Sequence, residues 1–351
     1  MHLSRRSFLR LLPAALLLPG CAGSGSRVVL YSAQDREFAE GILADFEKDG
    51  GLKVVTKYDT EANKTVGLYV EIVAEKDHPR CDVWWNNEIL GTIRLEQQGL
   101  LASHDSPSAA PYPAWTKGKD HTWYAFAERA RILVVNTKLV AEKDRPQSLL
   151  ELTEPRWRGK VVMAKPQYGT TATQAACLFA VLGEERAKAF YRNLKKNDLH
   201  IAPGNKQVAE WVGEGKTPTG QPALVGITDT DDAMEEVTAG HPVAIVFPDS
   251  KAKKGSPLGT LFIPNTLCIP RGCPNLDGAK KLVDFLLSAS VEKRLAEGPS
   301  AQIPLNPQVV AKLPPQLETA ATVKAMEVDW YKAAEAWNEV QTFLTKEIIT
   351  P

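Results

Sequence analysis

The stretch that decides the fold is RVVLYSAQDREFAEGILADFEKDGGLKVVTKY, residues 27–58. Its first six residues, rich in Val and Leu, are typical of a buried strand. From Glu37 to Lys48 the apolar residues recur at helical spacing, and Gly50 and Gly51 then end the helix. Residues 52–58 predict a second strand. This β-α-β order favours a parallel sheet covered by helices.

The same alternation continues and then starts again further along the chain. Helices are predicted at 65–75, 171–182, 184–196 and 206–213, and strands at 81–85, 159–164 and 223–228. A β-rich stretch at 122–136 and another near 242–248 predict two crossings between separate units. The predicted class is α/β with two lobes, each a mostly parallel sheet flanked by helices.

These crossings set the expected domain boundaries. We expect lobe 1 to contain residues 27–125 and 249–300, and lobe 2 to contain residues 126–248. Residues 301–351 form a C-terminal segment in which Met326, Trp330, Trp337, Val340 and Leu344 recur at helical spacing. That spacing predicts a helix packed on the body of the protein.

The N-terminus carries an export signal. Residues 4–10 (SRRSFLR) form a twin-arginine motif, and the apolar run from Leu11 to Leu18 is too short to span a bilayer. The sequence LPGC at 18–21 resembles a lipobox, in which Cys21 is lipidated after cleavage of residues 1–20. Residues 21–26 then form a flexible tether. We expect a periplasmic or cell-surface protein held to the membrane by this lipid alone.

Composition narrows the functional class. The chain has 42 basic and 42 acidic side chains, so no basic excess indicates a nucleic-acid partner. No nucleophile-elbow, HExxH, P-loop or zinc spacing is present, and we expect neither an enzyme nor a cofactor. Cys81 and Cys177 are expected to be buried thiols, whereas Cys268 and Cys273 are candidates for a small disulfide.

Five segments in the same order carry a family resemblance. They are VLYSAQ (29–34), CDVWWNNE (81–88), RAR (129–131) leading into VVN (134–136), LTEPRWRGK (152–160) and IPLNP (303–307). Together they resemble class II periplasmic solute-binding proteins of ABC importers, of the ferric-iron-binding type. The resemblance implies a two-lobed fold with ligand held between the lobes, an ABC permease as membrane partner, and a monomer.

The candidate site lies in the loops that follow the strands, because ligands of open α/β sheets bind beyond the carboxyl ends of strands. Asp35 follows the first strand, and either contacts ligand or caps the next helix. Asn87 and Glu88 follow the strand that contains Trp84 and Trp85, where the resemblance places a metal-binding glutamate. A helix cap is the alternative here as well. Of the two tryptophans, we expect one in the core and one against the cleft.

A third loop opens a helix at Gly169, Thr170 and Thr171, where backbone N–H groups and hydroxyls favour an anion. In the family that the chain resembles, this loop binds an anion beside the iron, and the resemblance implies the same role here. Asn205 matches an asparagine that contacts the anion in that family. A fourth loop contains Asp229, Thr230, Asp231 and Asp232. In ferric proteins a tyrosine pair stands where this chain has Thr230 and Asp231.

The ligand class remains open on these residues. An anion-binding helix end opposite several carboxylates suits a hard cation bound with an anion, and a metal would use Asp35, Glu88 and Asp231. The same set suits a phosphorylated or zwitterionic organic solute, which we rank slightly above ferric iron because both tyrosines are missing. The functional alternatives are a ligand sensor that presents solute to a membrane receptor, and a hydrolase that uses the carboxylates as acid and base.

Overall fold

A computed structural model describes residues 27–59, 66–252 and 256–350. The strands are β1 (Arg27–Ser32), β2 (Lys53–Tyr58), β3 (Val83–Asn86), β4 (Leu101–Ala102), β5 (Trp123–Asn136), β6 (Val161–Ala164), β7 (His200–Ala202), β8 (Val225–Asp229), β9 (Val243–Val246) and β10 (Phe262–Pro270). The longer helices are α1 (Arg36–Gly50), α2 (Val66–Ala74), α3 (Leu90–Gln97), α4 (Gly169–Leu182), α5 (Glu184–Lys196), α6 (Asn205–Glu214), α7 (Thr230–Thr238), α8 (Leu276–Leu286) and α9 (Ala289–Glu297). The predicted β-α-β opening and the helix at 184–196 are confirmed.

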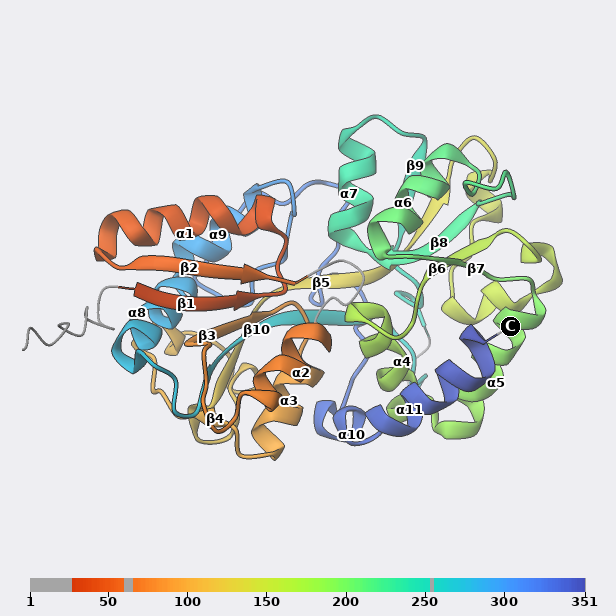
Figure 1. Cartoon of the computed structure of the whole chain (residues 1–351). Helices are drawn as coiled ribbons and strands as arrows, with labels where there is room; N and C mark the ends of the chain where they lie inside the picture. Colours follow the sequence, from red (N-terminus) through yellow and green to blue (C-terminus); the bar gives the residue numbers. More distant parts are fainter. Residues whose placement is uncertain (1–26, 60–65, 253–255, 351) are drawn as a thin grey trace, which may run out of the picture.

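Two lobes lie side by side and share one long strand (Figure 1). In lobe 1, β1 pairs in parallel with β2 and β3, and β10 runs antiparallel to β3, β4 and β5. In lobe 2, β6 pairs in parallel with β7 and β8, and β5 runs antiparallel to β8 and β9. The predicted α/β class with two lobes is confirmed.

Strand β5 joins the lobes, so the hydrogen-bonded strand order is continuous from β2 to β7. Residues 123–130 of β5 pair with β10, and residues 131–136 pair with β8 and β9. The cleft between the lobes therefore lies over the middle of β5. Our lobe boundaries at residues 125 and 249 remain a proposal.

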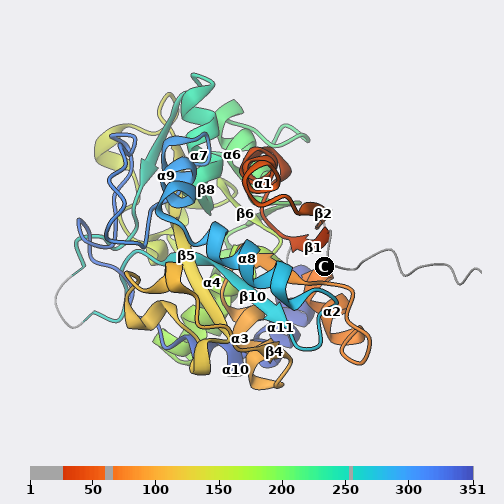
Figure 2. The same cartoon turned by 90° about the vertical axis from the view of Figure 1, so that its left-hand side faces the viewer.

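Helices cover both faces of the lobe 1 sheet (Figure 2). Apolar residues of α1, α8 and α9 pack on one face, and those of α2 and α3 pack on the other. Trp84 and Trp85 point to opposite faces, as strand geometry requires, but both are fully buried in the core. The expectation that one of them borders the cleft is wrong.

The predicted disulfide is also wrong, because Cys268 and Cys273 are both free thiols. Cys268 lies within β10 and packs on the α2–α3 side of the sheet, whereas Cys273 packs on the α1–α8 side. The strand ends at Pro270, and Cys273 follows a turn in which its N–H donates to Pro270 O at 3.2 Å. Cys81 and Cys177 are buried thiols, as predicted.

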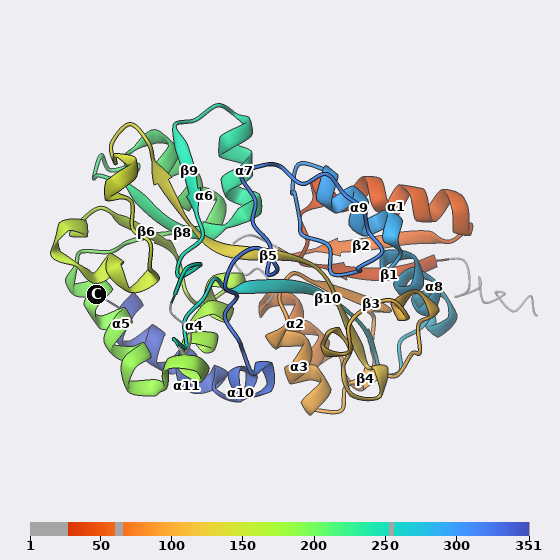
Figure 3. The ribbon, with the colours of Figure 1, turned by 180° about the vertical axis from the view of Figure 1, so that it is seen from behind.

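The C-terminal segment bridges the lobes (Figure 3). It forms α10 (Trp330–Glu335), α11 (Trp337–Phe343) and a final π-helical turn at Leu344–Ile349. Helix α10 contacts both α3 of lobe 1 and α4 of lobe 2. The single predicted helix is thus divided, and Met326 precedes it, with its N–H bonded to Thr260 O at 2.8 Å.

The predicted signal peptide, lipobox Cys21 and tether lie outside the described residues. Within the part of the chain that the structure describes, no helix is both long and apolar enough to cross a membrane.

Candidate functional site

Most of the predicted site residues meet at one small cavity between the lobes. The cavity has a volume of about 30 Å³ and is lined by Asp35, Asn87, Arg129, Gly169, Thr170, Asn205, Asp229, Asp231 and Asp232. Lobe 1 contributes the loops after β1 and β3, and lobe 2 contributes the starts of α4, α6 and α7. Sequence reasoning identified seven of these residues and did not single out Arg129 or Asp232 as site residues.

The cavity has a fully buried arginine behind its wall. The Arg131 side chain is 0% exposed, and its Nη1 donates to Asp229 Oδ1 at 2.9 Å and to Thr170 Oγ1 at 3.2 Å. The same nitrogen donates to Asn205 Oδ1 at 3.1 Å, and Nε donates to Gln174 Oε1 at 3.1 Å. One guanidinium thus joins β5, β8 and the first turns of α4 and α6.

A second buried arginine, Arg129, lies two residues earlier on the same strand. Its Nη1 donates to Asp231 Oδ2 at 3.2 Å, and its Nη2 donates to the carbonyl of Asn87. Burial by itself lowers the pKa of Arg129, but the neighbouring carboxylates of Asp231 and Asp229 outweigh it and the pKa is raised. Arg129 is therefore charged and connects the two sides of the cleft.

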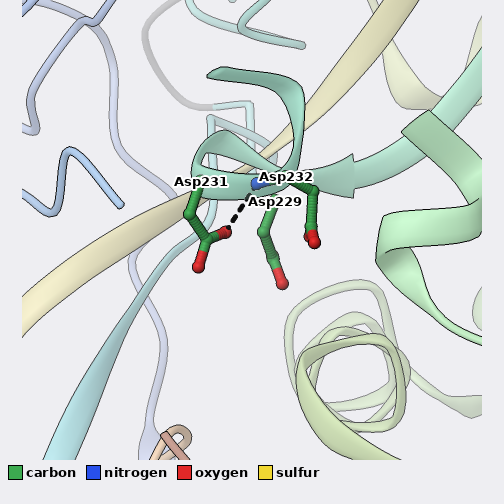
Figure 4. A group of neighbouring side chains, drawn as sticks. All are labelled: Asp229, Asp231 and Asp232. Atoms are coloured by element: carbon green, nitrogen blue, oxygen red, sulfur yellow. Dashed lines mark hydrogen bonds between the residues drawn. The ribbon is translucent and has the colours of Figure 1, made fainter. Parts of the chain in front are cut away.

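Three carboxylates project from the end of β8 and the first turn of α7 (Figure 4). Asp229, Asp231 and Asp232 each place an oxygen within 4.8 Å of the others. Asp231 Oδ1 also accepts from the Asp232 N–H at 3.1 Å, and Asp232 Oδ2 accepts from Thr228 Oγ1 at 3.2 Å. With two arginines against these three acids and Asp35, the cavity lining is acidic overall.

Two polar atoms at this cavity have no hydrogen-bond partner. The Oδ1 of Asn87 and the Nε of Arg129 are both buried and unpaired, in residues that are only 3% and 2% exposed. Burying an unpaired polar atom costs free energy, so such atoms call for a partner from outside the chain. A bound solute would supply one.

Glu88 does not belong to the cavity, which corrects its predicted role as a ligand or metal residue. Its carboxylate accepts from the backbone N–H groups of Leu90 at 2.6 Å and Gly91 at 2.8 Å, at the start of α3. It also accepts from Asn86 Nδ2 and Thr173 Oγ1, each at 2.9 Å. The capping alternative therefore applies to Glu88, and the acids that lie together are Asp229, Asp231 and Asp232.

Thr230 is another predicted site residue that faces elsewhere. It is fully buried, and its hydroxyl accepts from the Ala130 N–H at 3.2 Å. Asp35 lies at the N-cap position of α1, but its side chain makes no capping hydrogen bond and lines the cavity instead. Asp35 thus lines the cavity and does not cap the helix through its side chain.

A second small cavity of about 20 Å³ adjoins the first. It is lined by Ala164, Lys165, Tyr168, Gly169, Thr171, Pro203, Gly204 and Asn205. Gly169 and Asn205 line both cavities. The first turns of α4 and α6 meet here, and the first N–H groups of a helix have no partner within it. We call this second cavity the helix notch.

The two arginines are the main feature that the sequence reasoning missed. RAR at 129–131 served only as a family signature, yet its two arginines stand two residues apart in the buried strand Trp123–Asn136, whose other charged residue is Glu128. Strand residues two apart share a face, so a pair of charges there indicates a common polar surface. Within this buried strand, that surface needed acidic partners, and Asp229 and Asp231 two residues apart provide them.

Comparison with known proteins identifies the family. The family described as bacterial extracellular solute-binding protein matches residues 93–330. This chain belongs to that family. The solute-binding protein therefore holds a ligand outside the cytoplasm and is not an enzyme, so the hydrolase alternative is set aside.

Individual relatives cover most of this solute-binding protein. The major ferric iron-binding protein of Neisseria meningitidis is 25% identical over 321 residues, 86% of this chain and 87% of the relative. A probable ABC transporter periplasmic-binding protein of Sinorhizobium fredii is 24% identical over 276 residues, 75% of this chain and 71% of the relative. The periplasmic binding protein AfuA from Actinobacillus pleuropneumoniae, solved with exogenous fructose-6-phosphate, superposes with a TM-score of 0.78 at 24% identity, covering 93% of this chain and 99% of AfuA. This last match establishes the fold.

Proposed function

We propose that this protein captures a small polar solute in the cleft and delivers it to the permease of an ABC importer. The family supports solute capture, and the relative named as an ABC transporter periplasmic-binding protein supports the importer. In this proposal the protein is a monomer, exported through its twin-arginine signal and anchored to the membrane by a lipid on Cys21. Its partners are the solute and the permease, and no nucleic acid is involved.

The observation that carries the proposal is the pair of unpaired buried atoms at the cavity. Asn87 Oδ1 is contributed by lobe 1 and Arg129 Nε by the strand shared between the lobes. A ligand that hydrogen-bonds both, and that also reaches Asp231 from lobe 2, holds the lobes together. Such a ligand is polar, because the lining offers it carboxylates, an amide and a guanidinium.

We place a phosphorylated or zwitterionic organic solute above ferric iron as the ligand. Ferric iron needs several hard oxygen donors, and Thr230 and Asp231 stand where ferric proteins have tyrosines. Thr230 Oγ1 is bonded to Ala130, and Asp231 is paired with Arg129, so neither replaces a tyrosinate. An ammonium or hydroxyl group of an organic solute would instead meet the carboxylates.

The anionic group of such a solute would occupy the helix notch. Two helix N-termini and Lys165 are favourable for a phosphate or carboxylate there, and Thr171 adds a hydroxyl. Since the notch shares Gly169 and Asn205 with the acidic cavity, one short molecule can reach both.

Ferric iron is the second candidate, on the observation that Asp229, Asp231 and Asp232 can approach one ion together. A thermal-shift screen of the mature protein against ferric salts, sugar phosphates, aminophosphonates and polyamines separates the two. A ligand at 100 times its Kd stabilises the folded state by about 2.7 kcal/mol, which shifts the melting temperature measurably. Stabilisation by an organic phosphate or zwitterion is expected, and stabilisation by ferric iron alone would reverse the ranking.

A further inference from the structure

An internal carboxylate occupies the place predicted for an external anion. Asp229 Oδ2 accepts from the hydroxyl of Thr170 and from Asn205 Nδ2, the latter at 3.0 Å. Thr170 is the second residue of α4 and Asn205 the first residue of α6. The other oxygen of Asp229 accepts from Arg131 at 2.9 Å. Both oxygens are therefore bound by donors that would otherwise serve a bound anion.

These donors would form a strong anion site if Asp229 were absent. Arg131 is fully buried and charged, and two helix N-termini add partial positive charge beside it. We propose that Asp229, held by Arg131, is a built-in counter-anion, so that the main cavity needs no co-bound anion and receives the cationic or hydroxyl part of its ligand. This inference rests on the proposed function, because it assumes that a ligand binds. The hydrogen bonds that hold Asp229 do not depend on that function.

The other residues that line the cavity also favour a cationic ligand. Asp229 is paired with Arg131 and Asp231 with Arg129, and the carboxylates of Asp35 and Asp232 line the same cavity. The unpaired acceptor of Asn87, in a side chain that is 97% buried, calls for an N–H or O–H donor from the ligand. An anion in the main cavity would have to displace Asp229 and face these carboxylates.

The test removes the internal anion and offers a replacement. Asp229→Ala deletes a carboxylate and leaves Arg131, Thr170 and Asn205 without it. Formate has the same three non-hydrogen atoms as the deleted group. Compared with chloride at equal ionic strength, we expect formate to raise the melting temperature of Asp229→Ala by several degrees more than that of the wild type, whose helix notch also suits a small anion. Asp232→Ala is the matched control, because Asp232 lies in the same lining but accepts from Thr228, and formate should affect it as it affects the wild type.

Equal effects of formate on all three proteins, or none on a folded Asp229→Ala, would overturn the inference. If Asp229→Ala does not fold, the inference can be tested with three other variants. These are Arg131→Met, Asp229→Asn and the double variant that combines them, and their melting temperatures are compared. A buried counter-anion predicts that the double variant melts higher than Arg131→Met alone, because the latter leaves Asp229 unpaired. If the decreases in melting temperature of the two single variants simply add in the double variant, the inference is contradicted. No solute is present in these experiments, so failure of the ligand screen would leave their outcome unaffected.

Discussion

The carboxylate of Glu88 accepts a hydrogen bond from Thr173 Oγ1 at 2.9 Å, between the start of α3 in lobe 1 and the second turn of α4 in lobe 2. Both residues are fully buried, and they are 85 residues apart in sequence. The bond therefore links the two lobes. It also explains why an acidic residue beside the site is not one of the groups that line it.

Glu88→Ala should destabilise the protein by about 1–3 kcal/mol, because it leaves buried donors at the start of α3 and on Thr173 without an acceptor. Urea unfolding measures this loss, with the exposed Glu185→Ala as control. The affinity for the ligand should change much less than the stability. A Glu88→Ala variant of normal stability that no longer binds would instead make Glu88 a ligand residue.

Glu128 should give the protein a distinct pH dependence of stability. Burial, and then the nearby Glu292, raise the pKa of Glu128 from 4.5 to about 8. Between these values the unfolded chain has lost a proton that the folded protein keeps, so stability decreases as the pH rises through this window. The slope is about 1.4 kcal/mol per pH unit.

Glu128→Gln keeps the group neutral and should remove this slope. Urea unfolding from pH 5 to 8 on both proteins gives the difference, which should grow with pH in favour of the variant. Parallel curves would mean that Glu128 titrates normally in the folded protein.

The cysteines should behave as free thiols. Alkylation of the unfolded protein without reductant should label Cys81, Cys177, Cys268 and Cys273, as mass spectrometry can count. Burial raises the pKa of Cys273 to about 11, so the folded protein should react slowly at neutral pH. A mass two units lower per pair, or a melting temperature that reductant lowers, would indicate a bridge.

Cys21→Ala should release the protein from membranes, because the lipid on this residue is the proposed anchor. Fractionation of cells followed by immunoblotting separates the two forms. An unchanged membrane fraction would show that the lipobox prediction is wrong.

Local patterns predicted much of the fold. The helices at 171–182, 184–196 and 206–213 were predicted from short-range periodicity, and the structure places α4, α5 and α6 there. Side-chain contacts in the folded protein were harder to predict from the sequence. Glu88 and Asp231 are both acidic residues in loops after strands, and only the structure places one on a helix start and the other beside Arg129. The pair of Arg129 and Asp231 joins residues 102 apart, which local spacing does not encode, whereas the local cap at Glu88 was one of two alternatives that the sequence left open.

The most direct test of the account is a calorimetric titration of the solute selected by the thermal screen. Wild type and Asp144→Ala, a change in an exposed turn, should bind alike. Asn87→Ala and Asp231→Ala should each bind at least about tenfold more weakly, since each loses a hydrogen bond or charge contact worth about 1.4 kcal/mol or more. Unchanged affinity in both cavity variants would contradict the claim that the solute binds between Asn87 and Asp231.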